Sequence, residues 1–167
     1  MFPFPRFLFY FCLFSTFSVS CVFAQEPWKP GNYTVKEIAD CNIFDIAVSQ
    51  FSPSREIRYC NERFNQLNER YPWAGHFYYV HEYGHIILRS GDEVMVDNWA
   101  CIQIANMDKG YLIINAFLRH LMERCSENEP PIRGYGTPCE RMRRIAKFTM
   151  NANPYLCFDE LRGQFDN

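Results

Sequence analysis

A five-residue stretch, His81-Glu82-Tyr83-Gly84-His85, constrains the fold of this chain more than any other feature. On an α-helix, side chains at positions i and i+4 share a face one turn apart, so a helix there would place His81 and His85 side by side. Pro72 stands where a first-turn proline would, and the helical pattern runs from Trp73 to Leu88. We therefore predict a central, largely buried helix that carries both histidines on one side.

The same five residues carry the parts of a metal-dependent hydrolase. His81 and His85 can bind one metal ion from the same side, and Glu82 projects toward the water that such an ion would hold. Gly84 costs about 1 kcal/mol of helix propensity, which indicates that another backbone or the metal site approaches closely there. Histidines also occur on helices for packing or solvation alone. An ordinary helix is therefore the alternative to a metal site.

A catalytic zinc ion usually takes three protein ligands and leaves a fourth position to water, so a third ligand is needed. The downstream candidates are Asp92, Glu93, Asp97, Cys101, His120 and Glu123. We select Glu93, because a turn at Ser90-Gly91 would bring the start of a second helix toward His85. Asp97, one helical turn later, could accept a hydrogen bond from a ligand histidine and fix its tautomer. A capping box between Ser90 and Glu93 is the alternative role for Glu93.

The stretch from His81 to His85, followed by Glu93-x-x-x-Asp97-x-Trp99-Ala100, resembles the gluzincin metallopeptidases. It is most similar to small HExxH proteins with a second motif E-x-x-A-D-x-[WF]-A, and the likeness covers residues 72–108. It implies a zincin-like fold in which the active-site helix packs against a second ligand-bearing helix. By this likeness His81, His85 and Glu93 bind Zn²⁺, Glu82 is the general base and Asp97 supports a ligand histidine. Val96 stands where these relatives have alanine.

The group that would stabilise the reaction intermediate is not evident from the sequence. Some relatives carry a T-H-P segment followed by Arg-Ile, whereas this chain has Thr137-Pro138 and later Arg144-Ile145, without the histidine. Four residues are candidate oxyanion donors, each with a surface or packing role as the alternative: Tyr135, Arg141, Arg144 and His120.

Residues 1–24 are typical of a secretory signal peptide. Arg6 is their only charge, and the stretch from Leu8 to Phe23 is apolar and rich in phenylalanine. The alternatives are an uncleaved membrane anchor, for which the stretch is short, and a lipid attached at Cys21. We expect the mature protein to begin near Gln25 and to be secreted or periplasmic.

The remaining residues, 25–167, are expected to form a single zincin-like domain. Removing residues 1–24 takes away one of the 17 basic residues and none of the 19 acidic ones, so 16 against 19 leaves a net charge of −3. This balance argues against nucleic acid as a partner. A second apolar span is absent from the sequence, so we expect no stable membrane span after signal removal.

Six cysteines remain after the signal: Cys41, Cys60, Cys101, Cys125, Cys139 and Cys157. An even number in an exported chain favours disulfides. Only the pair Cys125–Cys139 is singled out by its surroundings, because it would close the Pro130-Pro131 loop between two helices. Zinc binding by these cysteines is the alternative, but paired short spacings such as C-x-x-C are absent.

The secondary-structure pattern predicts a mainly α protein with a small β-sheet (α+β). Besides the histidine helix, helices are expected over residues 60–70, 92–107, 111–125 and 138–150, with an edge strand over 56–59, an irregular leader over 25–32 and a short final turn after Asn153-Pro154. Residues 41–48 fit either a short helix or a strand. Thr137, Pro138 and Glu140 form a helix-start signal with a capping box.

Taken together, these features predict an exported zinc-dependent metallopeptidase that acts on a peptide or protein substrate. One alternative is a non-catalytic, exported zincin-like module that is stabilised by disulfides and binds another protein. Another is a purely structural helical domain whose histidines bind nothing.

Overall fold

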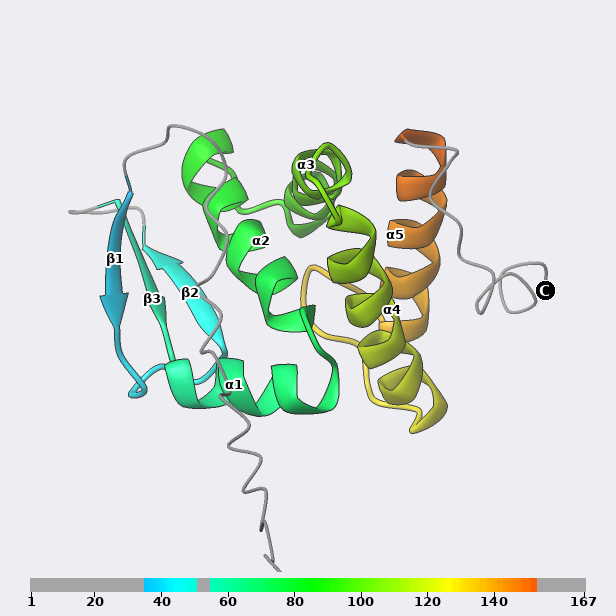
Figure 1. The fold of residues 1–167 in the computed structure, drawn as a ribbon, viewed down its shortest axis with the longest axis horizontal. Helices are drawn as coiled ribbons and strands as arrows, with labels where there is room; N and C mark the ends of the chain where they lie inside the picture. The colour runs from blue at the N-terminus through cyan, green and yellow to red at the C-terminus, as the bar shows by residue number, and fades with distance from the viewer. Residues whose placement is uncertain (1–34, 51–54, 153–167) are drawn as a thin grey trace, which may run out of the picture.

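The computed structural model describes residues 35–50 and 55–152 (Figure 1). In this part of the chain the elements are β1 (Lys36–Ala39), β2 (Ala47–Gln50), β3 (Glu56–Tyr59), α1 (Asn61–Arg70), α2 (Ala74–Leu88), α3 (Glu93–Ala105), α4 (Gly110–Ser126) and α5 (Pro138–Ala152). This confirms a mainly helical protein with a small sheet. The first and last residues of each helix lie within two residues of those predicted. The proposed signal peptide, the irregular leader and the final turn lie outside the described residues.

The sheet has the order β1-β3-β2, with β1 parallel and β2 antiparallel to β3. The prediction of an edge strand over residues 56–59 was therefore wrong, because β3 is the central strand. Its alternating charges suggested exposure, but Glu56 is buried and pairs with Lys36 and Arg58. Residues 41–46 form turns and bends, and the strand β2 begins at Ala47.

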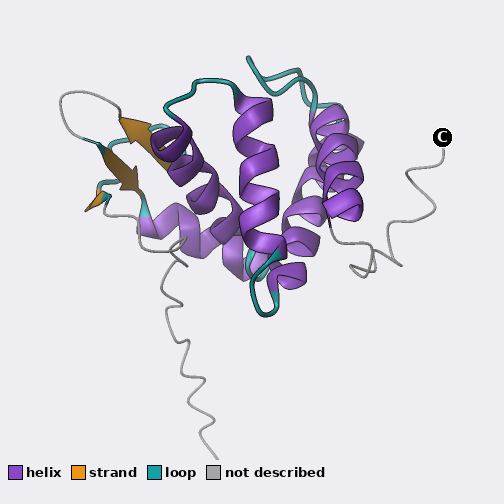
Figure 2. Cartoon of the chain, turned by 90° about the horizontal axis from the view of Figure 1, so that it is seen from above, coloured by secondary structure: helices purple, strands orange, loops and turns teal. Residues whose placement is uncertain are grey.

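Helix α2 lies between the sheet and the other long helices, and the strands gather at one side of the molecule (Figures 1 and 2). One core cluster joins α2 to α3, α4 and α5 and includes Phe77, Val80, Ala100, Ile104, Ile114, Phe117, Leu118 and Ile145. A second cluster joins α2 to the sheet and consists of Ala47, Ile57, Tyr79, Tyr83 and Ile86. Because α2 is covered on both sides, its position is fixed, as predicted for a central helix.

The close approach predicted at Gly84 occurs where α2 meets α3. A Cβ atom at this position would lie 2.8 Å from Cγ1 of Val96 and 3.0 Å from the ring of Trp99. The neighbour is thus the side chains of a second helix rather than the metal site. Glycine lets the two helices pack closely enough for side chains on both to meet.

The start of α3 tests the capping role considered for Glu93. Asp92 is the N-cap, and its Oδ1 accepts hydrogen bonds of 3.0 Å from the backbone N–H groups of Val94 and Met95. Ser90 Oγ in turn accepts from the backbone N–H of Asp92. The cap of α3 is therefore provided by Asp92, and the carboxylate of Glu93 lies beside the histidines of α2 instead.

Two disulfides lie in the described part of the chain. Cys125–Cys139 closes the loop between α4 and α5, as predicted, and Cys41–Cys60 links the turn before β2 to the residue after β3. Cys101 is a buried free thiol on α3, and Cys157 lies outside the described residues. None of the described helices combines the length and apolar character needed to cross a bilayer.

Candidate metal centre

The three predicted metal ligands converge on one point between α2 and α3. Nε2 of His81 lies 3.0 Å from Nε2 of His85 and 3.0 Å from Oε2 of Glu93, and Nε2 of His85 lies 3.1 Å from the same oxygen. Both histidines are buried, while Glu93 remains partly exposed. Solvent therefore reaches the cluster on the side of Glu93.

The geometry and chemistry of this cluster fit a zinc ion. Zinc bonds of 2.0–2.1 Å in tetrahedral geometry place neighbouring ligand atoms about 3.3 Å apart, so the three atoms need to separate only slightly. Two imidazoles and one carboxylate form a donor set found in catalytic zinc sites that keep a position for water. Other divalent ions accept the same donors.

The far nitrogen of each histidine ring lies close to an oxygen atom. Nδ1 of His85 donates a 2.7 Å hydrogen bond to the backbone carbonyl of Ser90, just beyond the end of α2. Nδ1 of His81 lies 2.9 Å from Oδ1 of Asp97, one turn along α3 from Glu93. Both oxygens favour a proton on Nδ1, so when either ring is neutral its lone pair is on Nε2 and faces the cluster. The support predicted from Asp97 thus has a geometric basis.

Asp97 is fully buried and is held by two arginines of α5. Arg141 donates two hydrogen bonds to its carboxylate, from Nε at 3.0 Å and from Nη2 at 2.8 Å, and Arg144 donates a third at 3.2 Å. Burial alone would raise the pKa of Asp97, but the charge of Arg141 and the contact with His81 hold it well below its usual range. A charged carboxylate is therefore fixed behind the ligand ring.

The predicted general base lies beside the ligands on the same helix. Glu82 is buried, and burial raises the pKa of its carboxyl, while the nearby His81 and His85 and a hydrogen bond with Ser49 of β2 act in the opposite direction. A carboxylate with a raised pKa is a better proton acceptor at neutral pH than an exposed one. The contact with Ser49 could not be predicted, because no sequence pattern links β2 to this helix.

The four candidate oxyanion donors lie in three different surroundings. Arg141 and Arg144 donate hydrogen bonds to the carboxylate of Asp97, which lies behind the histidines. Their guanidinium groups therefore do not face the side of the cluster where Glu93 lies. His120 lies on α4, 3.1 Å from the hydroxyl of Tyr78, and burial lowers its pKa to about 4. Tyr135, in the loop between α4 and α5, places its hydroxyl 3.0 Å from Nε2 of His81. Only Tyr135 of these four is brought to a ligand atom.

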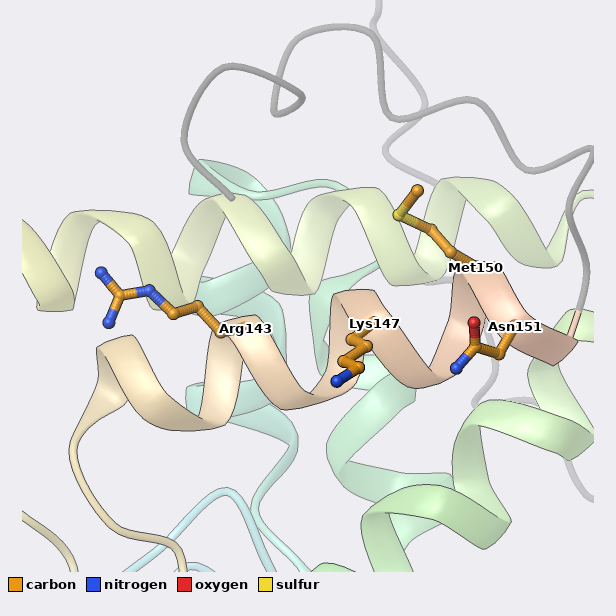
Figure 3. Close-up of a pocket in the computed structure, with 4 residues that line it drawn as sticks. All are labelled: Arg143, Lys147, Met150 and Asn151. Atoms are coloured by element: carbon orange, nitrogen blue, oxygen red, sulfur yellow. The ribbon is translucent and has the colours of Figure 1, made fainter. Parts of the chain in front are cut away.

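A separate hollow of about 240 Å³ lies along α5 (Figure 3). Its described lining consists of Arg143, Lys147, Met150 and Asn151, all from one face of this helix and all exposed. Flexible, solvated side chains of this kind do not form a catalytic constellation. The candidate functional site is therefore the cluster of His81, His85 and Glu93 between α2 and α3.

Comparison of the chain with protein-family models, with curated proteins and with solved structures finds no match in any of the three.

Proposed function

We propose that this chain is an exported, zinc-dependent metallopeptidase with a zincin-like fold. The observation that carries the proposal is the meeting of His81, His85 and Glu93 at mutual distances of 3.0–3.1 Å, with the buried carboxylate of Glu82 on the same helix. Catalytic zinc sites need this combination of ligands and base. The two disulfides are compatible with an exported protein.

In the proposed mechanism, each group of the site has one task. His81, His85 and Glu93 would hold a zinc ion, which would lower the pKa of a bound water toward about 7 and would polarise a substrate carbonyl. Glu82 takes the proton from the attacking water and passes it to the departing amine, so that the peptide bond breaks and two new ends form. Asp97 keeps the His81 ring in the tautomer that leaves Nε2 free.

The position of β2 supports a peptide as the substrate. Among the described strands, β2 pairs with β3 and with no other, and it packs against α2. Ser49 on β2 contacts Glu82, so the strand passes directly beside the proposed base. An extended peptide that adds to the other edge of β2 would bring its backbone carbonyls to the catalytic groups.

A non-catalytic exported module that binds another protein is the second candidate. It is favoured by the contacts that His81 makes with the carboxylate of Glu93 and with the hydroxyl of Tyr135, since these contacts satisfy the polar cluster by hydrogen bonding. This alternative predicts that the protein folds and binds its partner equally well with and without a chelator.

Metal content and metal-dependent cleavage separate these functions. The purified chain is analysed for zinc and incubated with a peptide library, with chelator and after zinc is restored. About one zinc per chain, with cleavage that chelator removes and zinc restores, supports the peptidase. Bound zinc without cleavage of any peptide supports the binding module. A chain that takes up no zinc contradicts the peptidase.

A further inference from the structure

The hydroxyl of Tyr135 lies at the cluster of proposed metal ligands. Its hydroxyl oxygen lies 3.0 Å from Nε2 of His81, which matches the 3.0–3.1 Å separations among the ligand atoms themselves. The loop that carries this hydroxyl also lies against Glu93, at Gly134. An oxygen donor therefore stands at the cluster in addition to the three ligands predicted from the sequence.

The loop that carries Tyr135 is built to bring it there. The Cys125–Cys139 disulfide joins the ends of the loop, and a turn is closed by hydrogen bonds from the backbone N–H groups of Tyr135 and Gly136 to the carbonyl of Ile132. Gly134, with φ +87°, lies against Glu93, where an added Cβ would stand 2.6 Å from Cγ. The loop thus packs directly on a ligand residue.

Two arginines of α5 hold the Tyr135 side of this contact. The guanidinium of Arg141 lies 4.0 Å from the centre of the Tyr135 ring, and Nη1 of Arg144 donates a 3.3 Å hydrogen bond to the Tyr135 carbonyl. These same arginines bind Asp97, which faces His81. The orientation of Tyr135 and that of a ligand ring are therefore fixed by the same pair of side chains.

We propose that Tyr135 is a fourth protein ligand, whose phenolic oxygen binds the same ion as His81, His85 and Glu93. This inference rests on the proposed metal site. On metal binding the phenol loses its proton to solvent as the bond between oxygen and metal forms, and no other bond changes. Because catalytic zinc sites can expand to five ligands, a fourth protein ligand leaves a position for the attacking water.

Copper provides a direct test, because a phenolate bound to Cu²⁺ gives a charge-transfer absorption band in the visible range. The full chain is loaded with Cu²⁺ as wild type, as Tyr135→Phe and as the control Tyr111→Phe, which changes an exposed tyrosine on α4. We expect the band in wild type and in Tyr111→Phe and its loss in Tyr135→Phe. We also expect zinc to bind Tyr135→Phe about tenfold or more weakly than wild type.

The outcomes distinguish this inference from the proposed function. Wild type that binds one copper without the band, or Tyr135→Phe that keeps it, overturns the ligand role of Tyr135 and leaves the three-ligand site standing. Wild type that binds no metal overturns both. Resonance Raman spectra of copper-loaded wild type, in which phenolate vibrations are expected, give the same decision without relying on the folding of any variant.

Discussion

Asp97 Oδ1 on α3 lies 2.9 Å from Nδ1 of His81 on α2, while Arg141 of α5 donates two hydrogen bonds to the same carboxylate. One buried negative charge thus joins three helices at the back of the proposed metal centre. The orientation of a ligand ring depends on this charge, and the charge depends on an arginine far away in the sequence. Substitutions of Asp97 and of Arg141 test the two halves of this arrangement separately.

Replacing Asp97 by Asn should weaken zinc binding about 10- to 100-fold, because the neutral amide no longer fixes the tautomer of His81. The measurement is a competition titration of zinc against a chromophoric chelator. Asp108→Asn is the matched control, since Asp108 is exposed in the turn before α4. Equal zinc affinities for Asp97→Asn and Asp108→Asn would show that the carboxylate does not support the ligand.

Replacing Arg141 by Met should destabilise the metal-free protein by about 3 kcal/mol, because Asp97 would keep its buried charge with only Arg144 as an arginine partner. Urea unfolding of both proteins without metal measures the difference. Arg143→Met removes an exposed arginine from the same helix and should change stability by less than about 0.5 kcal/mol. The prediction fails if the two substitutions cost the same.

Zinc binding should release protons near neutral pH. Burial lowers the pKa of His81, but Asp97 and Glu93 outweigh this effect and raise it above 6.5, and the pKa of His85 is raised as well. Because imidazole must be neutral to bind metal, zinc affinity falls as pH drops through these raised values, a window that begins above 6.5. The stability of the metal-free protein depends on pH in the opposite direction. The protonated histidines add to its free energy of unfolding at low pH, and this contribution is lost as pH rises through the same values.

Calorimetric titrations with zinc at pH 7, in two buffers of different ionisation enthalpy, measure this release directly. We expect the apparent binding enthalpy to differ between the buffers. Identical enthalpies would mean that zinc binding releases no proton, contrary to the direction of the histidine pKa shifts and to the proposed loss of the Tyr135 proton.

The two disulfides should differ in their effect on the metal centre. Removing Cys125–Cys139 by a double Ser substitution should cost about 3 kcal/mol of stability, given its sequence separation of 14, and should also weaken zinc binding through the Tyr135 loop. Removing Cys41–Cys60 in the same way should destabilise the protein without changing zinc affinity, because it ties β2 to β3. Parallel unfolding and zinc titrations compare the pairs. Equal loss of zinc affinity in both would contradict this assignment.

The sequence allowed the prediction of α2 and of the convergence of His81, His85 and Glu93 because both depend on local spacing. His81 and His85 share a face one helical turn apart, and Glu93 follows after a short turn, so no distant contact had to be known. The loop disulfide was predictable for the same reason.

The surroundings of the site could not be predicted, because they depend on long-range packing. Arg141 lies 44 residues from Asp97, and Tyr135 lies 54 residues from His81. The central position of β3 was missed because the ion pairs that bury Glu56 involve β1 as well as β3 itself. The alternating charges were interpreted as a sign of exposure. In the folded protein, ion pairs with Lys36 and Arg58 compensate for the burial of Glu56.

The proposed role of Glu82, as the base of a zinc-dependent peptide hydrolysis, is tested most directly by comparing the cleavage rates of three proteins at equal zinc content. These are wild type, Glu82→Gln and Glu69→Gln, the last of which changes an exposed glutamate on α1. Each is incubated with the same peptide library, and the initial rate of cleavage is measured. We predict that Glu82→Gln binds zinc fully but cleaves at least about a hundredfold more slowly, while Glu69→Gln matches wild type. Cleavage by zinc-loaded Glu82→Gln at the wild-type rate would contradict the account.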